Sequence, residues 1–173
     1  LGSLLADDFS PEVVEALADK GTVSIDAQGY LREVVGEEVR PVEWKDMSRV
    51  LRATGILKLN ESEMQTVVGS NDPYEVGKKL AACGVGEVVM TLGSYGSVIY
   101  AGGKAYDIPA YKPKKLVDAT GCGDTFSTGY LWCRAQGMGI EEAGKFAAAM
   151  CSLKLQHSGP FDGTIADIEQ LIG

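Results

Sequence analysis

Apolar and polar residues follow two patterns along this chain, one typical of helices and one typical of strands. Apolar residues at helical spacing, with cap and breaker residues at the ends, predict helices at residues 10–19, 41–53, 61–68, 72–83, 125–136, 140–155 and 164–172. Short apolar runs predict strands at residues 22–26, 56–59, 87–92, 97–101 and 104–108, the last two joined by a hairpin. Residues 1–5 are expected to be the end of a strand and the turn that follows it. Strands that alternate with helices predict an α/β fold, a mainly parallel sheet with helices on both faces.

The length of the chain limits the number of domains. With 173 residues it is long enough for one substantial core and short for two, so residues 1–173 are expected to form a single α/β domain. The chain starts abruptly at Leu1 without an initiator Met, which predicts a C-terminal fragment of a longer protein. A sheet cut before Leu1 would expose a strand edge, so we expect a homo-oligomer or association with a missing N-terminal half.

Charge and composition narrow the class of partner. The net charge is -8, which argues against a nucleic acid or an anionic membrane surface as the partner. No apolar run reaches the about 18 residues of a transmembrane helix, and no signal peptide is visible. The four cysteines contain no C-x-x-C pair, and one His does not complete a usual zinc set with them. We therefore expect a cytoplasmic protein with reduced thiols.

The residues with the clearest chemical pattern are 117–126, Val-Asp-Ala-Thr-Gly-Cys-Gly-Asp-Thr-Phe. Gly121 and Gly123 flank a small residue, so the backbone can turn tightly with its N–H groups facing a ligand. The predicted helix that follows adds the positive end of its dipole, which suits an anion such as phosphate. Asp124 would repel that anion, unless it accepts a proton from a group that attacks the phosphate. The alternative is a helix cap without a catalytic role.

Residues 118–126, followed by Gly129, resemble the second signature of the ribokinase-like carbohydrate kinases, the PfkB family. Two further segments lie in the family's order: residues 58–63 resemble its Asn-x-x-Glu segment, and residues 91–96 resemble its nucleotide-side strand and loop. The resemblance covers nearly the whole chain and corresponds to the C-terminal half to three-fifths of such a kinase. It implies a ribokinase-like fold without the family's lid and N-terminal part.

The resemblance also implies an activity and roles for the loop. The expected reaction moves the γ-phosphate of ATP, with Mg²⁺, to a hydroxyl of a sugar or nucleoside. Asp124 is implied as the general base, with the N–H groups of Gly121, Cys122 and Gly123 as the anion hole for the phosphoryl group. The chemistry agrees, because charge on the phosphoryl oxygens needs fixed donors and the attacking hydroxyl needs a proton acceptor.

The remaining implied site residues lie outside that turn. Asn60 and Glu63 are implied to hold water-bound Mg²⁺ and phosphate, and their alternative role is a helix-capping pair. Three nucleotide contacts are implied at Thr91, Gly93 and Gly96, whose alternative is a plain turn. Monovalent-cation ligands, for K⁺, are implied at Asp118 and Thr120, with carbonyls near residues 157–159, although Asp118 can instead brace the loop.

Three alternatives compete with a kinase. A Rossmann dehydrogenase is disfavoured because Gly121-x-Gly123 lacks the third glycine, and a P-loop NTPase because no G-x-x-x-x-G-K-[ST] is present. A catalytically incomplete nucleotide-binding or regulatory module would use the same loop without an acceptor, and it stays open at this point.

Overall fold

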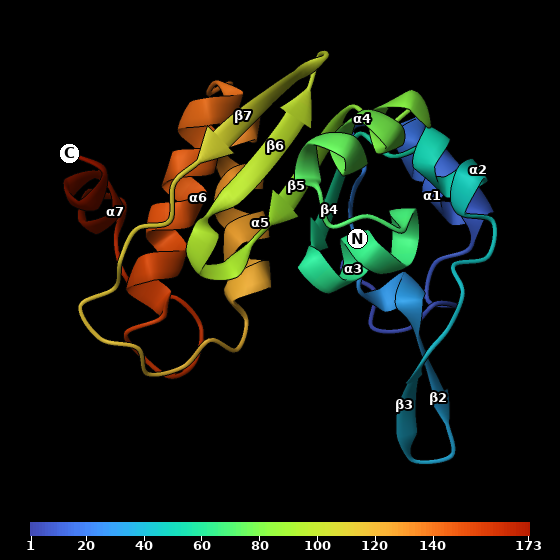
Figure 1. Ribbon diagram of the computed structural model, residues 1–173, viewed down its shortest axis with the longest axis horizontal. Helices are drawn as coiled ribbons and strands as arrows, with labels where there is room; N and C mark the ends of the chain where they lie inside the picture. The colour runs from blue at the N-terminus through green and yellow to red at the C-terminus, as the bar shows by residue number, and fades with distance from the viewer. The chain divides into compact units, whose positions relative to one another are not determined.

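The structure is a computed structural model of residues 1–173 (Figure 1). It contains seven α-helices, two short 3-10 helices at Gly29–Leu31 and Gly93–Tyr95, and seven strands. The helices are α1 (Pro11–Ala18), α2 (Met47–Arg52), α3 (Glu61–Val68), α4 (Pro73–Ala82), α5 (Cys122–Ala135), α6 (Ile140–Lys154) and α7 (Ile165–Ile172). The strands are β1 (Ser24–Asp26), β2 (Arg32–Val35), β3 (Glu38–Pro41), β4 (Ile56–Asn60), β5 (Glu87–Thr91), β6 (Ser97–Ala101) and β7 (Lys104–Ile108). None of the helices is long and apolar enough to cross a membrane.

The strands form two sheets. Five of them lie in the order β1-β4-β5-β6-β7, and β2 and β3 pair separately as an antiparallel hairpin. The first two strands of the larger sheet, β1 and β4, are parallel, and their register places Asp26 beside Lys58. The residues fall into two compact units, 1–90 with 100–105 and 91–99 with 106–173.

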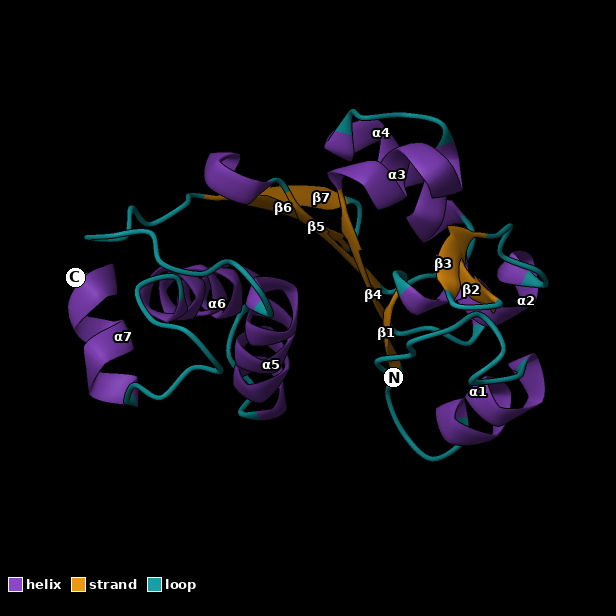
Figure 2. Cartoon of the chain, turned by 90° about the horizontal axis from the view of Figure 1, so that it is seen from below, coloured by secondary structure: helices purple, strands orange, loops and turns teal.

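The core of the first unit lies between β1, β4 and β5 and the helices beside them. Helix α3 packs on β4 and on α4, and α1 packs on α2 (Figure 2). Leu57 and Leu59 of β4 are fully buried, and burial of each contributes about 1.5–3 kcal/mol. The strand passes directly into α3, so its last residue, Asn60, is also the helix cap.

The core of the second unit is a pair of closely packed helices, α5 and α6, with α7 packed on α6. Gly129 permits the close approach, because a Cβ there would lie 3.0 Å from Met150 Sδ and 3.2 Å from Ala147 Cα. On the same pair, Trp132 stacks on Phe146 with ring centroids 5.3 Å apart. The alanine-rich segment of α6 is therefore a helix-packing surface.

The structure differs from the sequence-based expectation between residues 27 and 53. The predicted helix at 41–53 is wrong in its first half, because Pro41 ends β3 and the helix begins only at Met47. Asp46 has a left-handed backbone with φ of 53°, which interrupts any helix that starts earlier. The missed hairpin is formed by β2 and β3 (Figure 1). It turns at Gly36, whose φ is 67°, and all its strand residues are exposed. An apolar pattern cannot reveal strands that bury no face.

Candidate active site

The loop before α5 is held in shape by a left-handed glycine. Gly121 has φ of 75° and caps α5, which begins at Cys122, three residues earlier than the spacing predicts. The Gly121 carbonyl accepts from the Thr125 N–H at 2.9 Å and from the Thr125 hydroxyl at 2.8 Å. Only glycine adopts this φ without strain, so the loop depends on that residue.

The three proposed anion-hole residues differ in what their N–H groups do. The Cys122 N–H donates to the Ala119 carbonyl at 3.2 Å, so it is not a free donor. The N–H groups of Gly121, Gly123 and Asp124 donate to no acceptor within the chain. These groups occupy the start of a helix, where unpaired donors and the helix dipole attract an anion. The free donors thus include two of the predicted residues, together with Asp124 in place of Cys122.

Asp124 occupies the third helical position of α5, and its side chain is exposed. Its carboxylate accepts no hydrogen bond within the chain, so the helix-capping alternative finds no bond to support it. A carboxylate oxygen of Asp124 lies 4.0 Å from the point where a Cβ on Gly121 would stand. The side chain therefore remains available to accept a proton from a ligand.

Asp124 faces a cleft of about 460 Å³ in the second unit. The cleft is lined by Asp118, Thr120, Gly121, Asp124, Thr125, Thr128, Met150, Lys154, Gly159, Pro160 and Phe161. The lining comes from the loop before α5, from α5 and α6, and from the segment after α6. A cleft of this size with a few polar groups is typical of a small-molecule site.

Asp118 is tied to the loop on one side and to α6 on the other. Its Oδ1 accepts from the Thr120 N–H at 2.9 Å, while its backbone N–H and that of Val117 donate to the Leu155 carbonyl at 3.3 and 2.8 Å. Lys154 Nζ donates to the Asp118 carbonyl at 3.0 Å and lies 3.4 Å from Oδ2. The Thr120 N–H, followed by the Thr120 side chain and Lys154, lowers the pKa of Asp118 to about 2.

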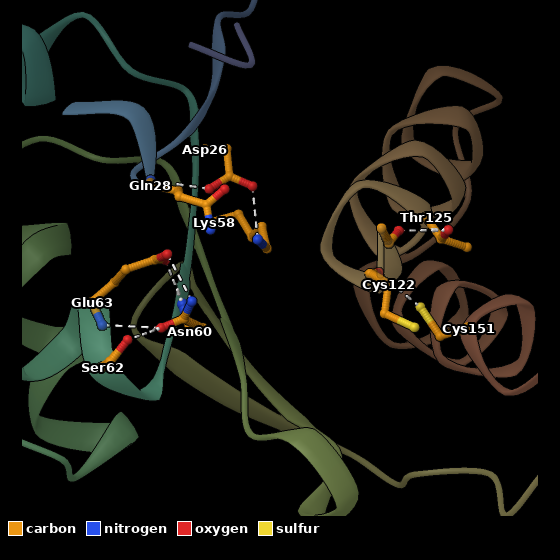
Figure 3. Close-up of polar contacts among 10 residues, drawn as sticks. Asp26, Gln28, Lys58, Asn60, Ser62, Glu63, Cys122, Thr125 and Cys151 are labelled. Carbon is orange, nitrogen blue, oxygen red and sulfur yellow. Dashed lines mark hydrogen bonds and ion pairs between the residues drawn. The ribbon is translucent and has the colours of Figure 1, made fainter. Parts of the chain in front are cut away.

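Cys122 is partly buried beside the same loop. Its carbonyl accepts a hydrogen bond from the Cys151 thiol at 3.2 Å (Figure 3). Burial raises the pKa of the Cys122 thiol, and Asp118 raises it further, while Lys154 opposes the shift. The thiol is consequently a weak nucleophile at neutral pH.

In the first unit, Asn60 and Glu63 form the predicted capping pair. The Glu63 N–H donates to Asn60 Oδ1 at 3.0 Å, and the Glu63 carboxylate accepts from the Asn60 N–H at 2.8 Å and from Nδ2 at 2.7 Å (Figure 3). Burial raises the pKa of Glu63, against the opposing effect of the Asn60 N–H. No group of three or more His, Cys, Asp or Glu side chains is arranged to hold a metal directly. The two oxygens of Glu63 keep further lone pairs, so its fit to Mg²⁺ is through the water shell of the ion.

The predicted nucleotide loop, residues 91–96, does not line the cleft. Gly93 and Gly96 have φ of 55° and 94°, and a Cβ on Gly96 would lie 2.2 Å from the Ile108 carbonyl oxygen. Gly96 also accepts from the Leu92 N–H at 2.8 Å. The backbone of the turn therefore accounts for glycine at both positions. A nucleotide contact at Thr91, Gly93 or Gly96 stays a prediction.

Two buried lysines were missed in the sequence. Lys58 lies in β4 between buried leucines, and its Nζ is 2.7 Å from Asp26 Oδ2 (Figure 3). Lys154 follows Ala147 and Cys151 at helical spacing on the inward face of α6. In both cases the sequence places a lysine at an apolar position of a strand or helix, and that pattern indicates a buried lysine.

The sequence profile of the pfkB family carbohydrate kinases matches residues 7–166. The chain belongs to this family. The chain is 28% identical over 124 residues to a nucleoside kinase of Methanocaldococcus jannaschii, covering 72% of this chain and 40% of that protein. The fold is ribokinase-like, a mostly parallel sheet flanked by helices.

Two solved structures of ribokinase-family proteins show the same fold. A pyrophosphate-dependent kinase in complex with a pyrophosphate analog and myo-inositol has a TM-score of 0.84 and 29% identity, over 96% of this chain and 60% of that one. The ribokinase of Arabidopsis thaliana in complex with ribose and ATP has a TM-score of 0.75 and 27% identity, over 94% and 51%. The chain thus spans less than two thirds of the length of each of these relatives.

Proposed function

We propose that this chain carries the phosphoryl-transfer centre of a kinase that acts on a hydroxyl of a sugar or nucleoside. The carrying observation is the exposed Asp124 carboxylate, free of internal partners, beside the unpaired N–H groups of Gly121 and Gly123. An acceptor for a proton and donors for an anion at one helix start are what phosphoryl transfer to a hydroxyl requires.

In the proposed reaction, Asp124 accepts the proton of the acceptor hydroxyl while the hydroxyl oxygen forms a bond to the terminal phosphorus of the donor. The bond from that phosphorus to its bridging oxygen breaks, and the remainder of the donor leaves with the bridging oxygen. The N–H groups of Gly121, Gly123 and Asp124 donate to the phosphoryl oxygens, where negative charge develops. Asn60 and Glu63 are the residues of the first unit that would hold hydrated Mg²⁺, an ion that neutralises phosphate charge when bound.

Two donors are candidates. ATP is favoured by the likeness to the Arabidopsis thaliana ribokinase with ribose and ATP, and pyrophosphate by the higher TM-score of the pyrophosphate-dependent kinase. The acceptor classes in these relatives, nucleosides, ribose and myo-inositol, define the panel to test. Product formation from each donor and acceptor pair, followed by phosphorus NMR, identifies the reaction. Nucleotide binding without turnover on any acceptor would favour a non-catalytic module instead.

The general base is tested by the substitution Asp124→Asn, which keeps the shape of the side chain and removes its proton-accepting capacity. We expect kcat to fall about 100- to 10,000-fold, the range of general base catalysis, while the Kd of the donor is nearly unchanged. The matched control is Asp167→Asn, because Asp167 is also an acid at the third position of a helix and lies outside the cleft. If Asp124→Asn retains most of the wild-type kcat, Asp124 is not the base.

A further inference from the structure

The charged group least exposed to water in the second unit is Lys154. It is the last residue of α6, with only 2% of its surface exposed, and its side chain forms part of the wall of the cleft. A buried ammonium group is destabilising unless oxygen atoms around it replace its water. Its oxygen partners therefore indicate its role.

Both partners of Lys154 belong to Asp118, at the root of the loop that leads to Asp124. The ammonium donates to the Asp118 carbonyl oxygen at 3.0 Å and forms an ion pair with Oδ2 at 3.4 Å. The neighbouring residue Leu155 accepts the backbone N–H groups of Val117 and Asp118. The end of α6 thus holds the loop by main-chain bonds and by one cation.

These contacts use lone pairs of the Asp118 oxygen atoms that would bind a monovalent cation, and they place an ammonium group beside those atoms. The carbonyl and Oδ2 face Lys154, Oδ1 accepts from the Thr120 N–H, and the Leu155 carbonyl already accepts two N–H groups. A cation such as K⁺ is bound by oxygen lone pairs, and it would meet the positive charge of Lys154 at this point. The residues present therefore do not fit the K⁺ site implied for Asp118 and Thr120.

We propose that Lys154 is a tethered cation, a positioning residue that takes the place of a bound monovalent ion and makes this loop independent of K⁺. Its ammonium fixes the carbonyl and carboxylate of Asp118, so that residues 118–121 present Asp124 and the free N–H groups in one arrangement. The inference rests on the proposed function for its effect on rate, while its effect on cation binding is separate.

The first test is the response of the wild-type protein to monovalent salts at constant ionic strength. We expect kcat and the thermal midpoint to be the same, within about 20% and about 1 °C, in potassium, sodium and choline chloride, because the ammonium of Lys154 already stands where the ion would bind. A severalfold activation by K⁺ over choline, or a clear K⁺-specific rise of the thermal midpoint, would overturn the proposal.

The second test substitutes Lys154→Ala, which removes the ammonium and opens space beside Asp118. We expect kcat to fall roughly 10- to 100-fold in choline chloride, since a misplaced loop has effects of that order, and K⁺ to restore part of it. We also expect K⁺ to raise the thermal midpoint of this variant, a readout that needs no kinase activity. An unchanged kcat together with no K⁺ effect on the thermal midpoint would show that Lys154 does not hold the loop in place of a monovalent ion.

Lys145→Ala is the matched control, because Lys145 lies on the same helix, is more exposed, and pairs with Glu141 rather than with the loop. We expect neither a loss of kcat nor a K⁺ effect in this variant. If Lys154→Ala does not fold in any salt, the wild-type salt series decides alone. If no donor and acceptor pair gives turnover, the proposed function fails, and the K⁺ effect on the thermal midpoints still tests the tethered cation.

Discussion

Removal of Lys58 is expected to destabilise the first unit strongly. Lys58 Nζ lies 2.7 Å from Asp26 Oδ2, and the two side chains are only 9% and 17% exposed. The substitution Lys58→Met keeps most of the buried volume and leaves the Asp26 carboxylate without its counter-charge. Breaking a buried pair on one side costs about 3–5 kcal/mol, and we take about 3 kcal/mol because Asp26 keeps some contact with water.

The double variant Asp26→Asn with Lys58→Met separates the stranded charge from lost packing. Removing both charges is expected to recover most of the loss, because a neutral pair needs no counter-charge. The asparagine Oδ1 also keeps the bond that Asp26 Oδ1 accepts from the Gln28 N–H at 3.1 Å. The control is Lys79→Met, since Lys79 pairs with Glu75 on the exposed face of α4 and should contribute below about 1 kcal/mol.

Urea unfolding followed by Trp44 fluorescence measures the change in the free energy of unfolding of the first unit, which contains both Lys58 and Trp44. Trp44 is buried against Tyr30 in the first unit, with ring centroids 4.5 Å apart, and Trp132→Phe silences the other tryptophan. With a slope of about 2–3 kcal/mol per molar urea, a loss of about 3 kcal/mol lowers the midpoint by about 1–1.5 M. A midpoint for Lys58→Met equal to that of Lys79→Met would refute the reasoning, as would a double variant no more stable than the single one.

The remaining predictions concern Glu63 and the thiols. Burial raises the pKa of Glu63, so its contribution to stability is full below the unfolded pKa of about 4.3 and is lost as pH rises through the folded value. We expect Glu63→Gln, which keeps a capping side chain, to be at least as stable as wild type at pH 7.5 and to have no such advantage at pH 4, where Glu63 is itself neutral. We also expect this substitution to raise the Mg²⁺ concentration needed for turnover. Urea midpoints and Mg²⁺ titrations check this, and an unchanged Mg²⁺ requirement would leave only the capping role. Maleimide should label exposed Cys83 first, Cys122 slowly and Cys133 last, because burial raises the pKa of the Cys122 thiol and raises that of Cys133 to about 11. Mass spectrometry of timed samples checks this order. Fast labelling of Cys122 would contradict it.

Local signals in the sequence were sufficient where the physics is local. Asn60 with Glu63 marked the start of α3, Asp72-Pro73 the start of α4, and Gly102-Gly103 the turn between β6 and β7. Each signal acts within about four residues, through a cap bond, a fixed φ or a tight turn. The same locality made residues 118–126 recognisable, because the glycine turn and the helix start that it caps are contiguous in the chain.

By itself, then, the sequence determined the alternation of strands and helices outside residues 27–53, the glycine turn before α5 with the carboxylate of Asp124, and the family. Only the tertiary structure decided what the buried charges do. Lys154 meets Asp118 across 36 residues, and Lys58 meets Asp26 across 32. A sequence pattern can show that a lysine lies on an inward face, but the energy of a buried charge depends on which oxygen atoms the fold brings to it. The contact between Lys154 and Asp118 therefore follows only from the packing of α6 against the loop.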